Sequence, residues 1–169
     1  QEPLERIETV YLDSHSLTSV RLVRILAARH WRIAPRWREL DDFSVLDAPA
    51  PRTGYLIIGD KVFEHEARFP YRYDLADAWR EMTGLPFVFA VWVARNGVPS
   101  ETTDALARSL EYGVRRIDEA IVRYGYGHKS YAHEYLTRNI DFVFDERKRR
   151  AMELYWAEGR RLDPPNLPG

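Results

Sequence analysis

Hydroxyl side chains are concentrated in one short stretch of the chain, the segment Asp13-Ser14-His15-Ser16-Leu17-Thr18-Ser19. The stretch lies between a predicted strand and a predicted helix. Unpaired backbone N–H groups and the positive end of the helix dipole meet at such a place, and hydroxyl groups add further donors. The stretch is therefore a candidate cradle for a carboxylate or a phosphate. Ser16 and Thr18 equally suit a purely structural role as helix caps.

Three more polar residues are placed where a ligand contact is plausible, and each has a structural alternative. His15 suits an acid or base beside a bound anion, or a local hydrogen bond within its loop. Asp60 follows Gly59 at the carboxyl end of a predicted parallel strand, the edge where open α/β sheets bind ligands, but it also suits capping of the next turn. Thr83 lies at a turn between a predicted helix and a predicted strand, where its hydroxyl is the group able to reach a ligand.

Metal and cofactor chemistry finds no support in the sequence. The chain has no cysteine, which removes disulfides, thiolate nucleophiles and cysteine zinc sites. His128 and His133 are five positions apart and so miss the usual spacing of helical metal ligands. Dinucleotide-binding, phosphate-loop and nucleophile-elbow motifs are not found. We expect no metal and no cofactor, and the catalytic residue stays unassigned.

Hydrophobic periodicity predicts the elements that position these residues. Strands are expected at residues 8–12, 35–40 and 55–58, and a strand buried on both faces at 85–94. Helices are expected at 17–30, 74–82, 100–121, 131–138 and 145–161. The fold class is therefore α/β, with an α/β lobe over residues 1–94 followed by a helical region over residues 95–169.

Composition narrows the possible partners and the location. The 169 residues carry a formal net charge of −1, so the chain has no positive field that would attract nucleic acid. No apolar run approaches the roughly 18 residues that a membrane helix needs. The absence of cysteine suits a reducing compartment, and we expect a cytoplasmic protein. Gln1 and the residues after it show no initiator methionine and no signal pattern, so we expect the chain to begin inside a longer protein.

The order of four motifs gives the chain a family resemblance. They are YLDSHSLTS at 11–19, IIGD at 57–60, YDL at 73–75 followed by Trp79, and TGLPFVFA at 83–90. In this order they resemble the chorismate dehydratases of the futalosine route to menaquinone. The resemblance implies the two-lobed type II periplasmic-binding-protein fold, in which a cleft between two lobes holds the ligand.

In that fold residues 1–94 correspond to most of the second lobe, and the helices after residue 100 are expected to pack on the first lobe. By this resemblance, the family's N-terminal segment, which carries an asparagine and a serine near the substrate, is expected to be missing from this chain. The resemblance therefore implies an exposed apolar surface on the C-terminal helices. A partner copy in a homodimer or a complementing N-terminal segment is expected to cover it.

The implied activity is that of a lyase, which dehydrates chorismate to 3-[(1-carboxyvinyl)oxy]benzoate. The ring becomes aromatic, so the protein mainly has to orient two carboxylates and help a hydroxyl leave. By resemblance the residues that hold a carboxylate are Ser14, Ser16, Thr18 and Ser19, and those that face the cleft are Asp60 and Thr83. No residue is identified as the base, and the substrate's own carboxylate is an admissible one.

Two other functions are compatible with the same fold. One is the dihydroxynaphthoate synthase of the same pathway, and the order of the motifs favours the dehydratase over it. The other is a non-catalytic solute-binding protein, which the fold by itself equally permits.

Overall fold

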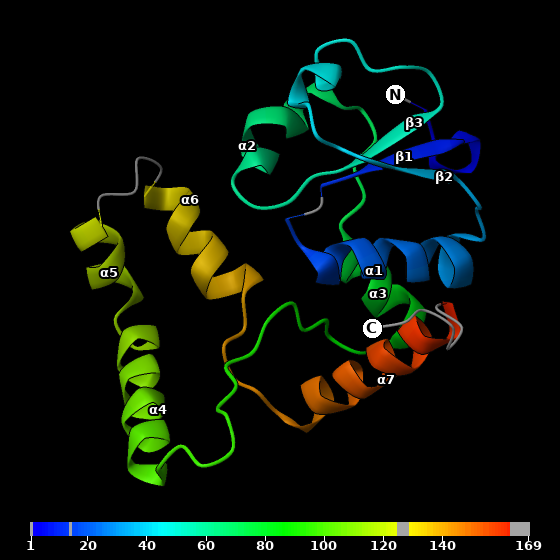
Figure 1. The fold of residues 1–169 in the computed structure, drawn as a ribbon. Coiled ribbons are helices and arrows are strands. Elements are labelled where there is room, and N and C mark those ends of the chain that lie inside the picture. The colour runs from blue at the N-terminus through cyan, green and yellow to red at the C-terminus, as the bar shows by residue number, and fades with distance from the viewer. Residues whose placement is uncertain (1, 14, 125–128, 163–169) are drawn as a thin grey trace. The chain divides into compact units, whose positions relative to one another are not determined.

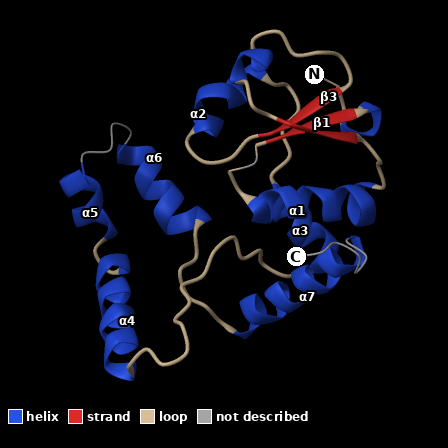
Figure 2. Ribbon diagram, in the orientation of Figure 1, coloured by secondary structure: helices blue, strands red, loops and turns tan. Residues whose placement is uncertain are grey.

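The computed structural model describes residues 2–13, 15–124 and 129–162. Contacts divide the chain into two compact units. Unit 1 comprises residues 1–89 and 146–169, and unit 2 comprises residues 90–145. Unit 1 contains the sheet, whereas the regular structure described in unit 2 is helical (Figure 2).

The sheet of unit 1 has three parallel strands, in the order β2-β1-β3. They are β1 (Thr9–Leu12), β2 (Arg36–Glu39) and β3 (Thr53–Leu56). The register pairs Leu12 with Glu39 on one side and with Leu56 on the other, so all three carboxyl ends meet at one edge. The strands predicted at 8–12, 35–40 and 55–58 are thus confirmed, although β3 both begins and ends two residues earlier than expected. The segments that follow these strands are the ones that can build a site.

Helix α1 (Leu17–Leu26) covers one face of the sheet and continues as a π-helical turn, Ala27–Trp31. Its Val23 packs with Val10, Leu12 and Leu56 of the strands. This arrangement confirms the predicted strand, loop and helix, and it fixes the start of α1 beside the carboxyl edge of the sheet. The turn ends at Arg32, which has a left-handed φ of 56°.

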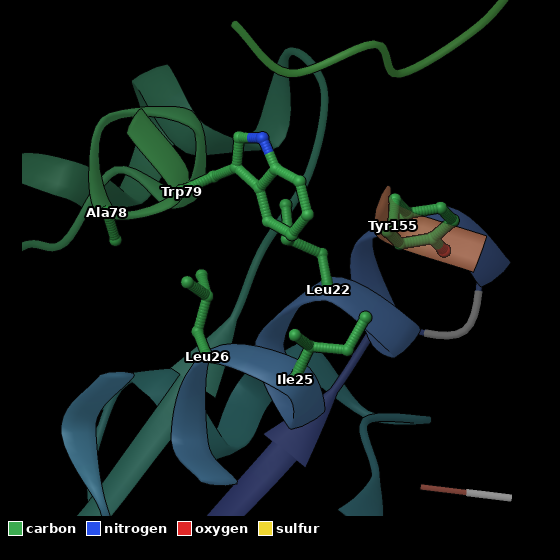
Figure 3. Packing of buried hydrophobic residues seen from close by; sticks show 6 residues of the cluster. All are labelled: Leu22, Ile25, Leu26, Ala78, Trp79 and Tyr155. Carbon is green, nitrogen blue, oxygen red and sulfur yellow. The ribbon is translucent and has the colours of Figure 1, made fainter. Parts of the chain in front are cut away.

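The opposite face of α1 packs against α3 (Leu75–Thr83) and α7 (Glu146–Leu162) (Figure 1). The cluster between these helices consists of Leu22, Ile25, Leu26, Ala78, Trp79 and Tyr155 (Figure 3). Trp79 is fully buried and makes edge-on contacts with the rings of Phe87 and Tyr155. Because α7 packs on α1, the C-terminal helix belongs to the same unit as the sheet.

The other α-helices among the described residues are α2 (Lys61–His65) in unit 1 and α4 (Ser100–Val114), α5 (Ile117–Tyr124) and α6 (Lys129–Glu134) in unit 2, and short 3-10 helices lie at Leu4–Arg6, Phe43–Leu46 and Glu66–Arg68. The prediction of a single helix at 100–121 is wrong, because residues 115–116 interrupt it and divide it into α4 and α5. Gly113 lies just before this break, and glycine weakens a helix. A π-helical turn, Tyr135–Asn139, extends α6, so the helix predicted at 131–138 is confirmed.

The strand expected at residues 85–94 is also wrong. These residues follow α3 and form no strand, and the apolar side chains from Phe89 onward are exposed, including Trp92 and Val93. A strand needs a hydrogen-bonded neighbour, and in the described residues the sheet contains β1, β2 and β3 alone. Apolar character on both faces was therefore insufficient to specify a strand.

Among the described residues, no helix combines the length and the apolar character that crossing a bilayer requires.

Candidate functional site

A buried carboxylate lies at the carboxyl edge of the sheet, directly after β1. The side chain of Asp13 is 0% exposed, and its Oδ2 accepts a hydrogen bond of 2.6 Å from Nζ of Lys61. Its Oδ1 lies 2.6 Å from Nδ1 of His15 and accepts the backbone N–H of His15 at 3.2 Å. Asp13 therefore joins the loop that leads into α1 to the first residue of α2.

The Asp13 carboxyl group is ionised at neutral pH. Burial acts most strongly and would raise its pKa, but the hydrogen bonds from Lys61 and His15, together with the charge of Lys61, outweigh burial and hold the pKa below the ordinary value of 3.8. An ionised carboxylate only accepts hydrogen bonds, so Nδ1 of His15 is the donor in their contact. The imidazole itself is mostly in solvent, with 74% of the side chain exposed.

Lys61 is held from two sides. Its Nζ donates to Asp13 and lies 4.4 Å from the ring centroid of Phe43, within cation–π range. Phe43 in turn stacks on His65, with ring centroids 6.1 Å apart. The side chain of Lys61 is still 34% exposed, so its ammonium group is fixed in place without being closed off from solvent.

The chain reaches Lys61 through a tight turn after β3. Gly59 has a φ of 67°, in the left-handed region that glycine adopts without strain. Asp60 precedes α2 in the cap position, and its side chain makes no capping hydrogen bond. The structure therefore does not show the predicted capping role of Asp60. The side chain of Asp60 is exposed, and Lys61 is the next residue in the sequence.

The start of α1 is built by serine side chains. The backbone N–H of Ser19 donates to Oγ of Ser16 at 3.2 Å, and the hydroxyl of Ser16 donates to Oγ of Ser19 at 3.1 Å. Ser16 is thus the N-cap that the sequence predicted, and Ser19 is buried beneath it. The backbone carbonyl of Thr18 accepts the hydroxyl of Tyr155 from α7 at 3.2 Å, while Ser14 lies outside the described residues.

Two surface hollows adjoin the carboxyl edge of the sheet. The larger, of about 360 Å³, is lined by the ends of β1 and β2 and by the first turns of α1, namely Leu12, Leu17, Val20, Arg24, Trp37, Arg38 and Glu39. The smaller, of about 200 Å³, is lined by Tyr11, Glu39, Leu40, Asp41, Asp42 and Val45. The first residue of α1, Leu17, is 83% exposed and lines the larger hollow, so the helix start borders an open space.

Thr83 occupies a different kind of position. Its hydroxyl donates to the backbone carbonyl of Trp79 at 2.7 Å and accepts the N–H of Leu85 at 3.1 Å. Next to it Gly84 has a φ of 71° and ends α3. The hydroxyl of Thr83 is therefore engaged at the end of its own helix, and Thr83 lines neither hollow.

The structure thus gathers Asp13, His15, Lys61 and the start of α1 at one edge of the sheet. Sequence reasoning selected His15 and Ser16 but overlooked Lys61, and it treated Asp13 as part of a loop. A usable signal existed, because Asp13 and Lys61 both follow neighbouring parallel strands at their carboxyl ends. In the part of the chain that the structure describes, no group of three or more His, Asp or Glu residues is arranged to hold a metal ion.

Comparisons with known proteins assign the chain to a family. A family model described as menaquinone biosynthesis matches residues 1–161. The chain is also 30% identical, over 135 residues, to a protein of Thermus thermophilus named chorismate dehydratase. The aligned region covers 69% of this chain and 49% of that relative, so the chain spans about half the length of the relative. Because the family match extends over nearly all of the sequence, the chain belongs to the menaquinone biosynthesis family.

Proposed function

We propose that the protein dehydrates chorismate to 3-[(1-carboxyvinyl)oxy]benzoate, a lyase step in menaquinone biosynthesis. The observation that carries this proposal is the similarity to a protein named chorismate dehydratase, within a family match over residues 1–161. The geometry supports it, because a helix start and a fixed ammonium group lie at the sheet edge where α/β folds bind anions.

The proposed fold of the complete protein is the two-lobed type II periplasmic-binding-protein fold. Three parallel strands with α1 on one face are consistent with one lobe of such a fold. We propose that residues 1–94 supply most of the second lobe and that residues 95–169 form the helical region, although α7 of this region packs on α1 of the second lobe and not on the first lobe. In this arrangement the carboxyl edge of the sheet faces the cleft between the lobes.

The proposed substrate contacts lie mainly in the loop before α1. Ser14, Ser16, Thr18 and Ser19 are proposed to hold one carboxylate of chorismate, using hydroxyl groups and the amide hydrogens of the first helical turn. Ser16 already satisfies the amide of Ser19, so the remaining amides of that turn are the donors available to a ligand. Asp60 and Thr83 are proposed to face the cleft.

The reaction removes one molecule of water from the ring. A proton leaves the carbon that bears the enolpyruvyl ether, the hydroxyl on the neighbouring carbon departs, and the new double bond completes an aromatic ring. We propose the substrate's own carboxylate as the base. The protein then contributes orientation and charge stabilisation, which act through fixed donors.

The complete protein is proposed to be cytoplasmic and to cover its exposed apolar side chains. Trp92 is 73% exposed, and Phe89, Val93, Phe142 and Phe144 are exposed as well. A second copy in a homodimer or a complementing N-terminal segment is the proposed cover. Light scattering of the purified chain, alone and after addition of the N-terminal half of a relative, distinguishes these two from each other.

Incubation of the full-length protein with chorismate tests the proposed function. An aromatic product, detected by absorbance and identified by mass spectrometry, is the expected result. Chorismate that binds and is recovered unchanged would instead indicate a solute-binding protein. Neither binding nor turnover, with conversion of a cyclised futalosine derivative, would indicate the dihydroxynaphthoate synthase.

A further inference from the structure

We infer that Lys61 binds a carboxylate of the ligand and that Asp13 is the positioning residue that holds the Lys61 ammonium in place for it. The identity of the ligand rests on the proposed function. The site itself rests on the contacts of Asp13, His15, Lys61 and Phe43, and on their place at the carboxyl edge of the sheet.

Stability alone explains the Asp13–Lys61 pair poorly. Removing a carboxylate completely from water carries a large penalty, and an ion pair recovers it only with good geometry and further hydrogen bonds. An apolar pair of similar size would often stabilise a fold equally well. The buried charge of Asp13 is therefore better explained by its effect on the orientation of Lys61 than by its effect on stability. Lys61 lies at the edge where α/β sheets bind ligands.

The ammonium of Lys61 keeps the capacity to bind a second anion. Its group has three hydrogens, and one of them points to Oδ2 of Asp13. The ring of Phe43 supports one side of the group, while about a third of the side chain remains in contact with solvent. His15 contacts the other oxygen of Asp13 through both its ring and its backbone N–H, and these hydrogen bonds favour one orientation of the Asp13 carboxylate.

A ligand with two carboxylates needs two places to bind, and this edge offers two. The start of α1 is the place already proposed for one carboxylate. Lys61 is connected to that loop through the same Asp13 side chain that His15 contacts. The second carboxylate is therefore assigned to Lys61, and the chemical class that the site selects is a small dicarboxylate rather than a monocarboxylate.

Binding measurements on the full-length protein test this assignment. Titration calorimetry with 3-[(1-carboxyvinyl)oxy]benzoate as the dicarboxylate and benzoate as the monocarboxylate compares wild type with Lys61→Gln. The loss of one charge-assisted contact should weaken dicarboxylate binding roughly tenfold or more and leave benzoate binding nearly unchanged. Lys61→Arg should keep part of the affinity. Asp13→Asn should weaken dicarboxylate binding although Lys61 is still present.

The control variant is Arg68→Gln, which removes an exposed cation paired with Asp47 and leaves the sheet edge intact. It should bind both ligands as wild type does, and melting temperatures of all variants report separately on folding. If Asp13→Asn does not fold, the comparison of Lys61→Gln with Lys61→Arg decides the matter by itself.

The outcomes separate this inference from the proposed function. Unchanged dicarboxylate affinity in Lys61→Gln, or an equal loss for both ligands, overturns the assignment, while turnover of chorismate by the wild type leaves the proposed function intact. Absence of turnover together with Lys61-dependent dicarboxylate binding supports the assignment and overturns the proposed function. Failure of the wild type to bind the dicarboxylate overturns the assignment, and the incubation with chorismate then decides the proposed function by itself.

Discussion

The Nζ atom of Lys61 donates a 2.6 Å hydrogen bond to Oδ2 of Asp13, a residue 48 positions earlier in the sequence. Each residue follows one of two neighbouring parallel strands, so the pairing of β1 with β3 brings the two side chains to the same edge. The contact fixes the loop before α1 relative to α2. The geometry of the candidate site is thus a direct consequence of strand order.

The Asp13–Lys61 contact should make Asp13→Asn destabilising. The variant leaves the ammonium of Lys61 without its charged partner. Because about one third of the Lys61 side chain is in solvent, hydration of the ammonium reduces the cost in stability. We expect the free energy of unfolding to fall by about 1–3 kcal/mol. Urea denaturation measures it. Asp118→Asn, which removes the carboxylate from an exposed contact with His133, is the matched control and should change stability by no more than about 0.5 kcal/mol.

Asp13 should also give the protein a specific dependence of stability on pH. Its folded pKa lies below the ordinary 3.8, so its contribution is fully present above that value and is lost as the pH falls through the folded pKa. The stability difference between wild type and Asp13→Asn should therefore be constant at neutral pH and shrink below about pH 4. Asp42, whose pKa is lowered by hydrogen bonds from Ser44, is present in both proteins and cancels. A difference that stays constant down to about pH 2 would contradict this interpretation.

Substitutions at the start of α1 can distinguish residues that stabilise the helix from residues that bind the substrate. Ser16→Ala removes the acceptor for the N–H of Ser19 and should cost about 1 kcal/mol of stability. Thr18→Val and Ser19→Ala should weaken turnover of chorismate more than they weaken folding. Steady-state kinetics and thermal melting of the same samples measure both effects. Equal loss of activity and stability would remove Thr18 and Ser19 from the proposed site.

The core between α1, α3 and α7 depends on Trp79. Because Trp79 is fully buried, Trp79→Ala should lower the free energy of unfolding by about 3–5 kcal/mol. Tyr71→Ala is the aromatic control, since Tyr71 is 47% exposed and is not among the side chains proposed to be covered, and it should change stability by about 0.5 kcal/mol or less. Comparable losses for the two variants would contradict the assignment of Trp79 to the core.

Local patterns were sufficient to predict the elements of unit 1 that carry the site. Strand-like alternation followed by Ser16 and a helical period predicted β1, the N-cap and α1 correctly. The helical period likewise predicted α3 at 74–82, and the structure caps this helix with Asp74 and ends it at Gly84. These signals work because caps, left-handed glycines and periodic apolar faces are determined by residues close together in the sequence.

Features that depend on distant residues were not predictable in the same way. The segment 85–94 has a strand-like composition, but a strand also needs a partner strand, which no local pattern can reveal. Lys61 follows a strand that neighbours β1, which places it near the same sheet edge as Asp13, but its contacts could not be predicted from the sequence. Its importance comes from the burial of Asp13 and from the ring of Phe43, and both contacts exist only after the strands are paired.

Mapping of the bound ligand tests the central claim most directly, namely that the ligand binds at the carboxyl edge of the sheet, between the start of α1 and Lys61. Backbone amide NMR signals of the full-length protein are followed while 3-[(1-carboxyvinyl)oxy]benzoate is added. We predict that the largest changes occur at residues 15–19 and 59–61. Saturable changes confined to other parts of the protein, with these amides unaffected, would contradict the claim.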